Sequence, residues 1–262
     1  MEPFETREHL TVVHEGQKIF GILHLPLIEG PVPCVVITHG FAGNKIGHRR
    51  LYVMLAESLA KEGIATFRFD HRGCGDSEGG FSQVTVETLV SDATYALSSL
   101  SDHERIDDSR LGLLGVSLGG PVSVLTAREH GELSSLALWA PVASGAQWQA
   151  DFAARYPSEM AEEHIHCGGE AASLAFKLQF LRMQMDEEMS YLSNLPLLHI
   201  HGDKDEVVFT NHAEIYEQAR ATADAISEFI RLPNSNHNFS MHAAERQQLV
   251  DVTTEWFKKT LS

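Results

Sequence analysis

Short apolar runs alternate along this chain with longer stretches in which apolar residues recur at helical spacing. This alternation is typical of a mostly parallel sheet that is covered by helices on both faces. The runs at 34–37 and 111–114 are continuously apolar, which favours central strands buried on both sides. The pattern predicts eight strands, at residues 10–14, 19–25, 34–39, 64–70, 111–116, 135–140, 197–201 and 226–232.

The first two predicted strands are more polar than the others and lie close together in the sequence. We therefore place them as an antiparallel pair at one edge of the sheet. Apolar stripes at helical spacing predict helices over 51–59, 86–97 and 249–257. We interpret these stripes as contacts with the core of the protein, without a catalytic role.

Between about residues 143 and 194 the alternation stops. This stretch is too long for one crossover helix and contains no convincing buried strand. We interpret it as an inserted cap or lid, which leaves 1–142 and 195–262 as a single core domain. A chain of 262 residues is long enough for one such domain, whereas two independent domains would each have a thin core.

Three aromatic residues, Trp148, Phe152 and Tyr156, lie at i, i+4 and i+8 within the predicted cap. On a helix they would form one aromatic face. Such a face can pack onto the main domain or line a substrate pocket, and the inner side of a lid can do both. We treat the three residues as candidate substrate-binding residues.

The net charge narrows the class of partner. The chain has 20 Lys and Arg against 36 Asp and Glu, which gives a formal net charge of -16. This charge disfavours nucleic acids, anionic membrane surfaces and strongly anionic substrates. We expect a neutral small molecule as the substrate.

The first ten residues lack the basic and apolar regions of a secretory signal, and no segment is long and apolar enough to span a bilayer. The three cysteines, Cys34, Cys74 and Cys167, are odd in number and widely spaced, which favours a reducing compartment. We therefore expect a cytoplasmic protein. His164, His166 and Cys167 could ligate a metal, but no second ligand cluster accompanies them, so we expect no metal site.

The segment Gly115-Val116-Ser117-Leu118-Gly119 matches the nucleophile elbow G-x-S-x-G. It comes directly after an apolar strand and before a predicted helix, where this motif is required to lie. The turn forces the serine into a strained backbone conformation, and a Cβ on either flanking residue would clash across it. The helix that follows directs its N-terminal dipole toward the serine. Ser117 is the predicted nucleophile.

A serine hydroxyl needs a base, and the base needs an acid that fixes its tautomer. In the order typical of this elbow, the acid and then a histidine follow the serine. After the strand at 197–201, the turn contains three acids, and either Asp203 or Asp205 could reach an imidazole. His237 is the one histidine in the loop after the strand at 226–232, so we predict it as the general base.

The tetrahedral intermediate of acyl transfer also needs two N–H donors for its oxyanion. The residue after the nucleophile, Leu118, provides one backbone N–H. The loop after the strand at 34–39 is flexible and glycine-containing, and its Phe41 backbone N–H is the predicted second donor. We expect His39 to be a structural hydrogen-bonding residue beneath this loop.

The chain resembles α/β-hydrolases of the bacterial cinnamoyl and feruloyl esterase type. The resemblance is carried by segments 39–41, 70–77, 115–119 and 201–205 and by the loop around His237, and it is weakest in the cap. It implies the α/β-hydrolase fold and a Ser-His-Asp triad. In the pattern H-G-x-x-D of these esterases the last position is the catalytic acid, which is Asp205 here. It also implies that segment 70–77 is structural and that 143–194 is a small lid that shapes the acyl pocket.

The function that follows is hydrolysis of carboxylic esters through an acyl-enzyme, of the feruloyl or cinnamoyl esterase type. The same triad could serve a thioesterase or an acyltransferase, and the sequence does not separate these activities. A non-catalytic ligand-binding protein on this fold would be expected to have lost a triad residue, and none is missing. We expect no cofactor. The sequence leaves the oligomeric state open, with a homodimer as one option.

Overall fold

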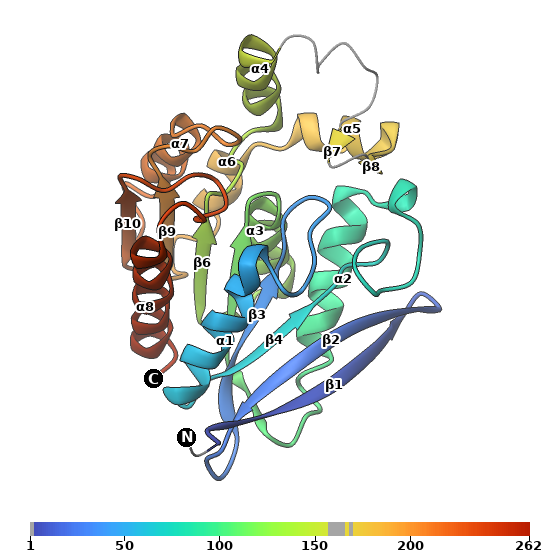
Figure 1. Ribbon diagram of the computed structural model, residues 1–262, viewed down its shortest axis with the longest axis vertical. Helices are drawn as coiled ribbons and strands as arrows, with labels where there is room; N and C mark the ends of the chain where they lie inside the picture. The colour runs from blue at the N-terminus through green and yellow to red at the C-terminus, as the bar shows by residue number, and fades with distance from the viewer. Residues whose placement is uncertain (1–2, 157–165, 168–169) are drawn as a thin grey trace.

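Eight strands form one mixed sheet in the computed structural model, which describes residues 3–156, 166–167 and 170–262 (Figure 1). The strand order is β1-β2-β4-β3-β5-β6-β9-β10. Strand β2 is antiparallel to both β1 and β4, and the other neighbouring strands are parallel to each other. The strands are β1 Glu5–His14, β2 Gln17–Pro26, β3 Val32–Thr38, β4 Ala65–Phe69, β5 Ile106–Val116, β6 Ser135–Trp139, β9 Leu197–Gly202 and β10 Ser227–Leu232.

This architecture confirms the predicted fold class and the antiparallel pair at the edge. Two strands begin earlier than the apolar pattern predicts, β1 at Glu5 and β5 at Ile106. The added part of β1 is mostly exposed and pairs with β2 through its backbone. Backbone pairing does not require apolar side chains, so the pattern underestimates the length of these strands.

Helices cover both faces of the sheet. Side chains of α1 and α8 pack on one face, and side chains of α2, α3 and α7 pack on the other. Among the described helices, none combines the length and the apolar character that a membrane span requires. The bounds are α1 Leu51–Lys61, α2 Val86–Ser98, α3 Gly119–His130, α7 Asn211–Ala219 and α8 Ala243–Thr260, with short 3-10 helices η1 His48–Arg50 and η2 Phe81–Gln83.

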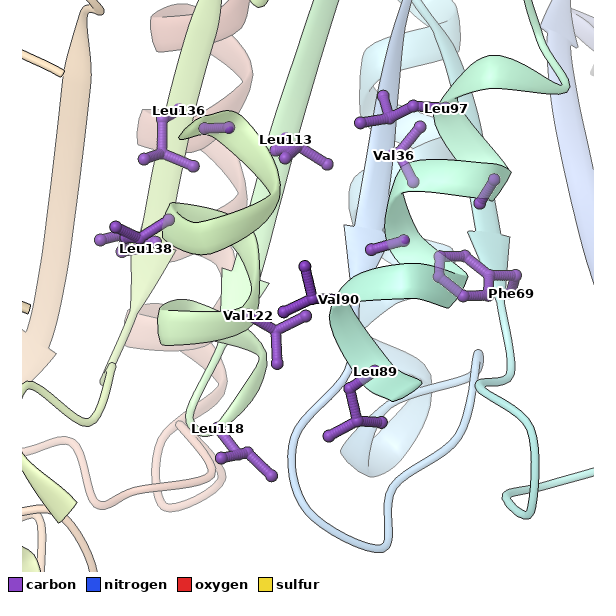
Figure 2. Close-up of a cluster of buried hydrophobic side chains, with 14 of the residues drawn as sticks. Val36, Phe69, Leu89, Val90, Leu97, Leu113, Leu118, Val122, Leu136 and Leu138 are labelled. Atoms are coloured by element: carbon purple, nitrogen blue, oxygen red, sulfur yellow. The ribbon is translucent and has the colours of Figure 1, made fainter. Parts of the chain in front are cut away.

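The larger part of the core lies between the sheet and helices α2 and α3 (Figure 2). There Leu89 and Val90 of α2, Val122 of α3, and Leu113 and Leu136 of the strands belong to one buried cluster. Strand β3 is buried along its whole length, and β5 is buried from Leu111 to Gly115, as expected for apolar runs covered on both sides. This packing fixes the ends of β5 and α3, between which Ser117 lies.

The segment between β6 and β9 holds α4 Gly145–Arg155, β7 His166–Cys167, β8 Glu170–Ala171, α5 Leu174–Arg182 and α6 Met185–Ser190. Helices α4 and α5 lie beyond one end of the sheet, at the top of Figure 1, whereas α6 packs against α3 and α7. The two ends of the part that contains α4 and α5 lie side by side, because residues 143–145 and 183–185 pair through their backbones. The Met185 N–H donates a hydrogen bond to Ala143 O at 2.8 Å, and Ser144 forms an isolated antiparallel β-bridge with Gln184.

Candidate active site

Ser117 lies in the tight turn that joins β5 to α3. Its φ is 56°, in the left-handed region that non-glycine residues rarely adopt. A Cβ on residue 115 would lie 2.3 Å from the Gly119 carbonyl oxygen, and a Cβ on residue 119 would lie 2.2 Å from the Thr38 carbonyl oxygen. Glycine is therefore the residue that fits at both positions. The turn holds the Ser117 hydroxyl at the end of the sheet where the parallel strands finish.

His237 lies in the loop after β10 and contacts both Ser117 and Asp205. Its Nε2 is 2.9 Å from Ser117 Oγ, and its Nδ1 is 2.7 Å from Asp205 Oδ2. A carboxylate accepts hydrogen bonds, so Nδ1 carries the proton and Nε2 is free to accept the serine proton. Ser117, His237 and Asp205 thus form one hydrogen-bonded triad, although His237 is 120 positions from Ser117 and 32 positions from Asp205 in the sequence.

Asp205 is buried, with 6% of its surface exposed, and both carboxylate oxygens are occupied. Oδ1 accepts hydrogen bonds from the Val207 and Val208 backbone N–H groups at 2.9 and 2.8 Å. Oδ2 faces His237 and also lies 3.4 Å from His201 Nε2. Burial by itself would raise the pKa of Asp205, but the hydrogen bonds from His201 and His237 lower it below its usual value. Asp205 is therefore the charged partner of the imidazole.

Asp203, the alternative acid, points elsewhere. It is exposed and accepts a hydrogen bond from Arg231 Nε at 3.1 Å. Its backbone N–H donates to Leu232 O, which fixes the turn after β9. The structure thus places Asp205 at His237 and Asp203 at the surface, although the sequence chemistry alone left both open.

The two predicted oxyanion donors, Phe41 and Leu118, line the same cavity as Ser117. Within the described part of the chain, neither backbone N–H has a hydrogen-bond acceptor. Leu118 precedes the first turn of α3, where N–H groups have no partner within the helix. The Gly40 backbone runs so close that a Cβ there would lie 3.1 Å from Ser117 Cβ. This arrangement can stabilise negative charge next to Ser117.

His39 is buried beneath this loop. Its Nδ1 pairs with the Gly40 carbonyl oxygen at 2.8 Å, and its Nε2 accepts a hydrogen bond from the His71 backbone N–H at 3.1 Å. Burial and the neighbouring His71 lower the pKa of His39 to about 3. A neutral imidazole bonded to backbone at both nitrogens supports the loop, as expected from the sequence.

In the part of the chain that the structure describes, two cavities meet at Ser117. The first, which we call the small cavity, has a volume of about 70 Å³. The second, the large cavity, has a volume of about 420 Å³. The small cavity is lined by Phe41, Ser117, Leu118, Val142, Trp148, Phe176, Phe180 and Val207. The large cavity is lined mainly by residues 40–52, by Val116, Ser117 and Val207, and by His237, Asn238 and Phe239.

The three predicted cap aromatics lie on or just past α4, and they have different positions. Trp148 lines the small cavity, and its Nε1 donates a hydrogen bond to Val207 O at 2.9 Å. Phe152 stacks on Trp148 with ring centroids 4.9 Å apart, and Tyr156 contacts Phe152 in turn. Neither Phe152 nor Tyr156 is among the residues that line the small cavity. Of the predicted aromatic face, only the Trp148 ring lines the small cavity, and the rings of Phe152 and Tyr156 follow it in a row away from the cavity.

His201 and Val207 belong to the site, although the sequence did not predict either of them as a site residue. His201 is completely buried; its Nε2 donates to Val208 O at 2.8 Å, and its Nδ1 lies 3.2 Å from His199 Nε2. Val207 lines both cavities and accepts the Trp148 hydrogen bond through its carbonyl. His201 precedes Asp205 by four residues across a turn, a spacing that could have indicated contact. Val207 acts through its backbone, which leaves no signal in the sequence.

Among the described residues, no three His, Cys, Asp or Glu side chains form a group that could hold a metal ion. Of the three candidate ligands in the cap, His164 lies outside the described residues, and so do the side chains of His166 and Cys167.

Comparison with known proteins places this architecture in a family. The family model described as serine aminopeptidase S33, a hydrolase model, matches residues 29–161, which include the elbow and the loop of Phe41. The chain belongs to the serine aminopeptidase S33 family of α/β hydrolases. The chain is 30% identical over 210 residues to the uncharacterised protein YfhR of Salmonella typhi. That alignment covers 80% of this chain and 65% of the length of YfhR.

One further curated relative and one solved structure are also similar to this chain. The thiohydrolase aneE of Aspergillus aculeatus is 36% identical over 118 residues, which is 45% of this chain and 35% of aneE. A solved structure of Est1E from Butyrivibrio proteoclasticus, with bound ferulic acid, superposes with a TM-score of 0.80 at 19% identity. The superposition covers 96% of this chain and 99% of Est1E. At that identity the likeness supports the fold.

Proposed function

We propose that this chain hydrolyses carboxylic esters through an acyl-enzyme, with Ser117 as nucleophile, His237 as general base and Asp205 as the acid that orients the imidazole. The backbone N–H groups of Phe41 and Leu118 are the proposed oxyanion donors. The observation that carries the proposal is the hydrogen-bonded triad, in which His237 Nε2 lies 2.9 Å from Ser117 Oγ and His237 Nδ1 lies 2.7 Å from Asp205 Oδ2. Ser117 lines both of the cavities described above.

In the first half of the reaction, His237 Nε2 takes the hydroxyl proton while Ser117 Oγ attacks the ester carbonyl carbon. Negative charge develops on the carbonyl oxygen, which the two backbone N–H groups can stabilise. The ionised Asp205 stabilises the imidazolium that forms. The tetrahedral intermediate collapses, His237 returns the proton to the alcohol oxygen, and the alcohol leaves Ser117 acylated.

In the second half, water enters where the alcohol was bound. His237 takes a proton from the water as the oxygen attacks the acyl carbon, and Ser117 receives a proton when the second intermediate collapses. The acid is released and the serine is regenerated. Each step uses only the three side chains and the two backbone donors.

Thioester hydrolysis is a second candidate. It is favoured by the partial likeness to a thiohydrolase, which spans 45% of this chain. The same nucleophile and base serve both reactions, because only the leaving atom differs. A thioester with the same acyl group as a good ester substrate, hydrolysed with a kcat/KM roughly 100-fold higher, would make thioesters the preferred class.

The test is a Ser117→Ala variant assayed with p-nitrophenyl acetate and a fluorophosphonate probe. We expect kcat/KM to fall at least roughly 10⁴-fold and labelling to disappear, because the attacking oxygen is gone. The melting temperature should change little, since the strained turn belongs to the backbone. The matched control is Ser98→Ala, an exposed serine on α2, which should retain full activity. A fully active Ser117→Ala protein contradicts the proposal.

A further inference from the structure

The two cavities at Ser117 differ about sixfold in volume, so the two halves of a substrate are held to different size limits. The small cavity has about 70 Å³ and the large cavity about 420 Å³. A cavity of about 150 Å³ holds one benzene molecule. The small cavity therefore has room for a few carbon atoms, whereas the large one has room for a ring with substituents.

The position of His237 decides which half of the ester each cavity receives. The leaving alcohol takes its proton from His237, so the alcohol oxygen must face the imidazole. His237 lines the large cavity and does not line the small one. The alcohol thus leaves toward the large cavity, and the acyl group points into the small cavity.

The side chains of the two cavities agree with this assignment. Apart from Ser117, the small cavity is lined by apolar and aromatic residues, which suits a hydrocarbon acyl group. The large cavity has polar side chains as well, among them Asn44, His48 and Asn238. Such a lining suits an alcohol of mixed polarity better than a fatty acyl chain.

The aromatic side chains that line the small cavity are held in place by contacts with one another and with the backbone. Trp148 is fixed by its hydrogen bond to Val207 O, and its ring meets Phe180 edge to face at 5.4 Å between centroids. Phe180 stacks on Phe176 at 5.8 Å, and Phe176 contacts Phe41 at 5.0 Å. Because each ring is held by the next, enlarging the cavity would require several rings to move together.

We propose that this enzyme is specific for esters of short-chain acids, roughly two to four carbons long, with bulky alcohols. This inference rests on the proposed ester hydrolysis and deepens it. It departs from the feruloyl or cinnamoyl acyl group that the sequence resemblance implies. A feruloyl group carries a substituted benzene ring, and a ring alone exceeds the volume of the small cavity.

The decisive experiment uses two esters of identical composition in which the ester group is reversed. Phenethyl acetate has a small acyl group and a bulky alcohol, whereas methyl hydrocinnamate has a bulky acyl group and a small alcohol. We expect the wild-type kcat/KM to be at least tenfold higher for phenethyl acetate. Equal rates, or a preference for methyl hydrocinnamate, would overturn the inference while leaving ester hydrolysis intact.

A variant then tests whether the small cavity is the cause. Phe176→Ala should raise kcat/KM for p-nitrophenyl octanoate relative to p-nitrophenyl acetate by about tenfold or more, because the cavity gains the volume of a ring. Leu178→Ala is the matched control on α5, since Leu178 is 48% exposed and outside both cavities. Its ranking of the two esters should equal that of the wild type. An unchanged ranking in Phe176→Ala overturns the assignment of the acyl group to this cavity.

Two measurements keep the test decisive. If Phe176→Ala does not fold, the milder Phe176→Leu takes its place, and the wild-type comparison of the reversed esters needs no variant. Failure of the underlying function has its own signature: no ester of either kind is hydrolysed and the fluorophosphonate does not label Ser117. That result would overturn both proposals, whereas labelling together with a wrong ester preference overturns only this one.

Discussion

At the scale of single residues, burial separates two aspartates that the sequence presents as near equals. Asp203 and Asp205 follow the same strand, two positions apart, yet Asp203 meets solvent and Arg231 while Asp205 is enclosed beside His237. A carboxylate shielded from water interacts more strongly with an imidazolium than an exposed one does. The enclosed position therefore suits the role of fixing the imidazole tautomer and stabilising its charge.

Replacing each aspartate by asparagine tests this difference. Asp205→Asn should lower kcat/KM for a good ester roughly 10³- to 10⁴-fold, because the neutral amide neither holds the tautomer nor stabilises the imidazolium. Asp203→Asn should stay within about threefold of the wild type, since it loses one exposed ion pair. Steady-state kinetics on both variants, with circular dichroism to check folding, provides the comparison. Greater damage from Asp203→Asn would show that the other carboxylate is the acid.

At the scale of elements, the segment that carries α4 and α5 is attached through a narrow stem. Its two ends pair between Ala143–Gly145 and Met183–Met185, and the Gly145 N–H donates to Met183 O at 3.2 Å. Gly145 is packed so closely that a Cβ there would lie 1.8 Å from the Phe180 carbonyl oxygen. The division into a core and a cap is a proposal that this stem supports. The stem sets the position of Trp148 and Phe180, which line the small cavity.

Gly145→Ala should therefore disturb the stem. A methyl group at this position must push the α5 backbone away, so we expect a loss of stability of about 1–3 kcal/mol and an altered preference between acetyl and octanoyl esters. Differential scanning calorimetry and the ester series measure the two effects. The control is Gly80→Ala, where the nearest atoms would lie 3.8 Å from the added Cβ. A Gly145→Ala protein indistinguishable from this control would contradict the stem as the attachment point.

At the scale of the whole molecule, several histidines are buried in the neutral form. His212 of α7 is completely buried, its Nδ1 accepts the Ala143 backbone N–H at 3.0 Å, and burial lowers its pKa to about 4. His39 is lowered to a pKa of about 3, also mainly by burial. An unfolded chain protonates its histidines near pH 6.5. Below that pH the unfolded state therefore binds protons that the folded state does not.

When the unfolded state binds more protons, the free energy of unfolding falls as the pH falls, here from about 6.5 toward about 4. His212 alone contributes on the order of 2 kcal/mol of this loss between pH 7 and pH 5. His212→Gln should remove that part, so its stability should decline less steeply over the same range. Urea unfolding at pH 7, 6 and 5 measures the slope.

The measured quantity is the slope of the free energy of unfolding against pH. A loss of stability that is equal at every pH leaves this slope unchanged. His9→Gln, at an exposed position on β1, is the control and should keep the wild-type slope. Parallel curves for His212→Gln and the wild type would contradict a neutral buried His212 as a source of acid sensitivity.

The sequence by itself determined the fold class and the order of the chemical groups. Buried strands and helices need apolar residues at their own periods, and the tight turn at Ser117 needs glycines at fixed positions, so local pattern carries both signals. In the first half of β1 the strand pairs with β2 through its backbone, and its own residues are mostly exposed. The apolar pattern gives no signal there, so the strand was predicted too short.

Tertiary structure alone decided which groups meet and how much space they leave. The contact of His237 with Ser117 joins residues 120 positions apart, and the separation of Asp203 from Asp205 depends on which side of the turn the core covers. The small cavity is formed by side chains from several loops and helices, and the fixed ring of Trp148 depends on a backbone carbonyl. Volumes and backbone contacts arise from packing between distant segments, and no single stretch of sequence encodes them.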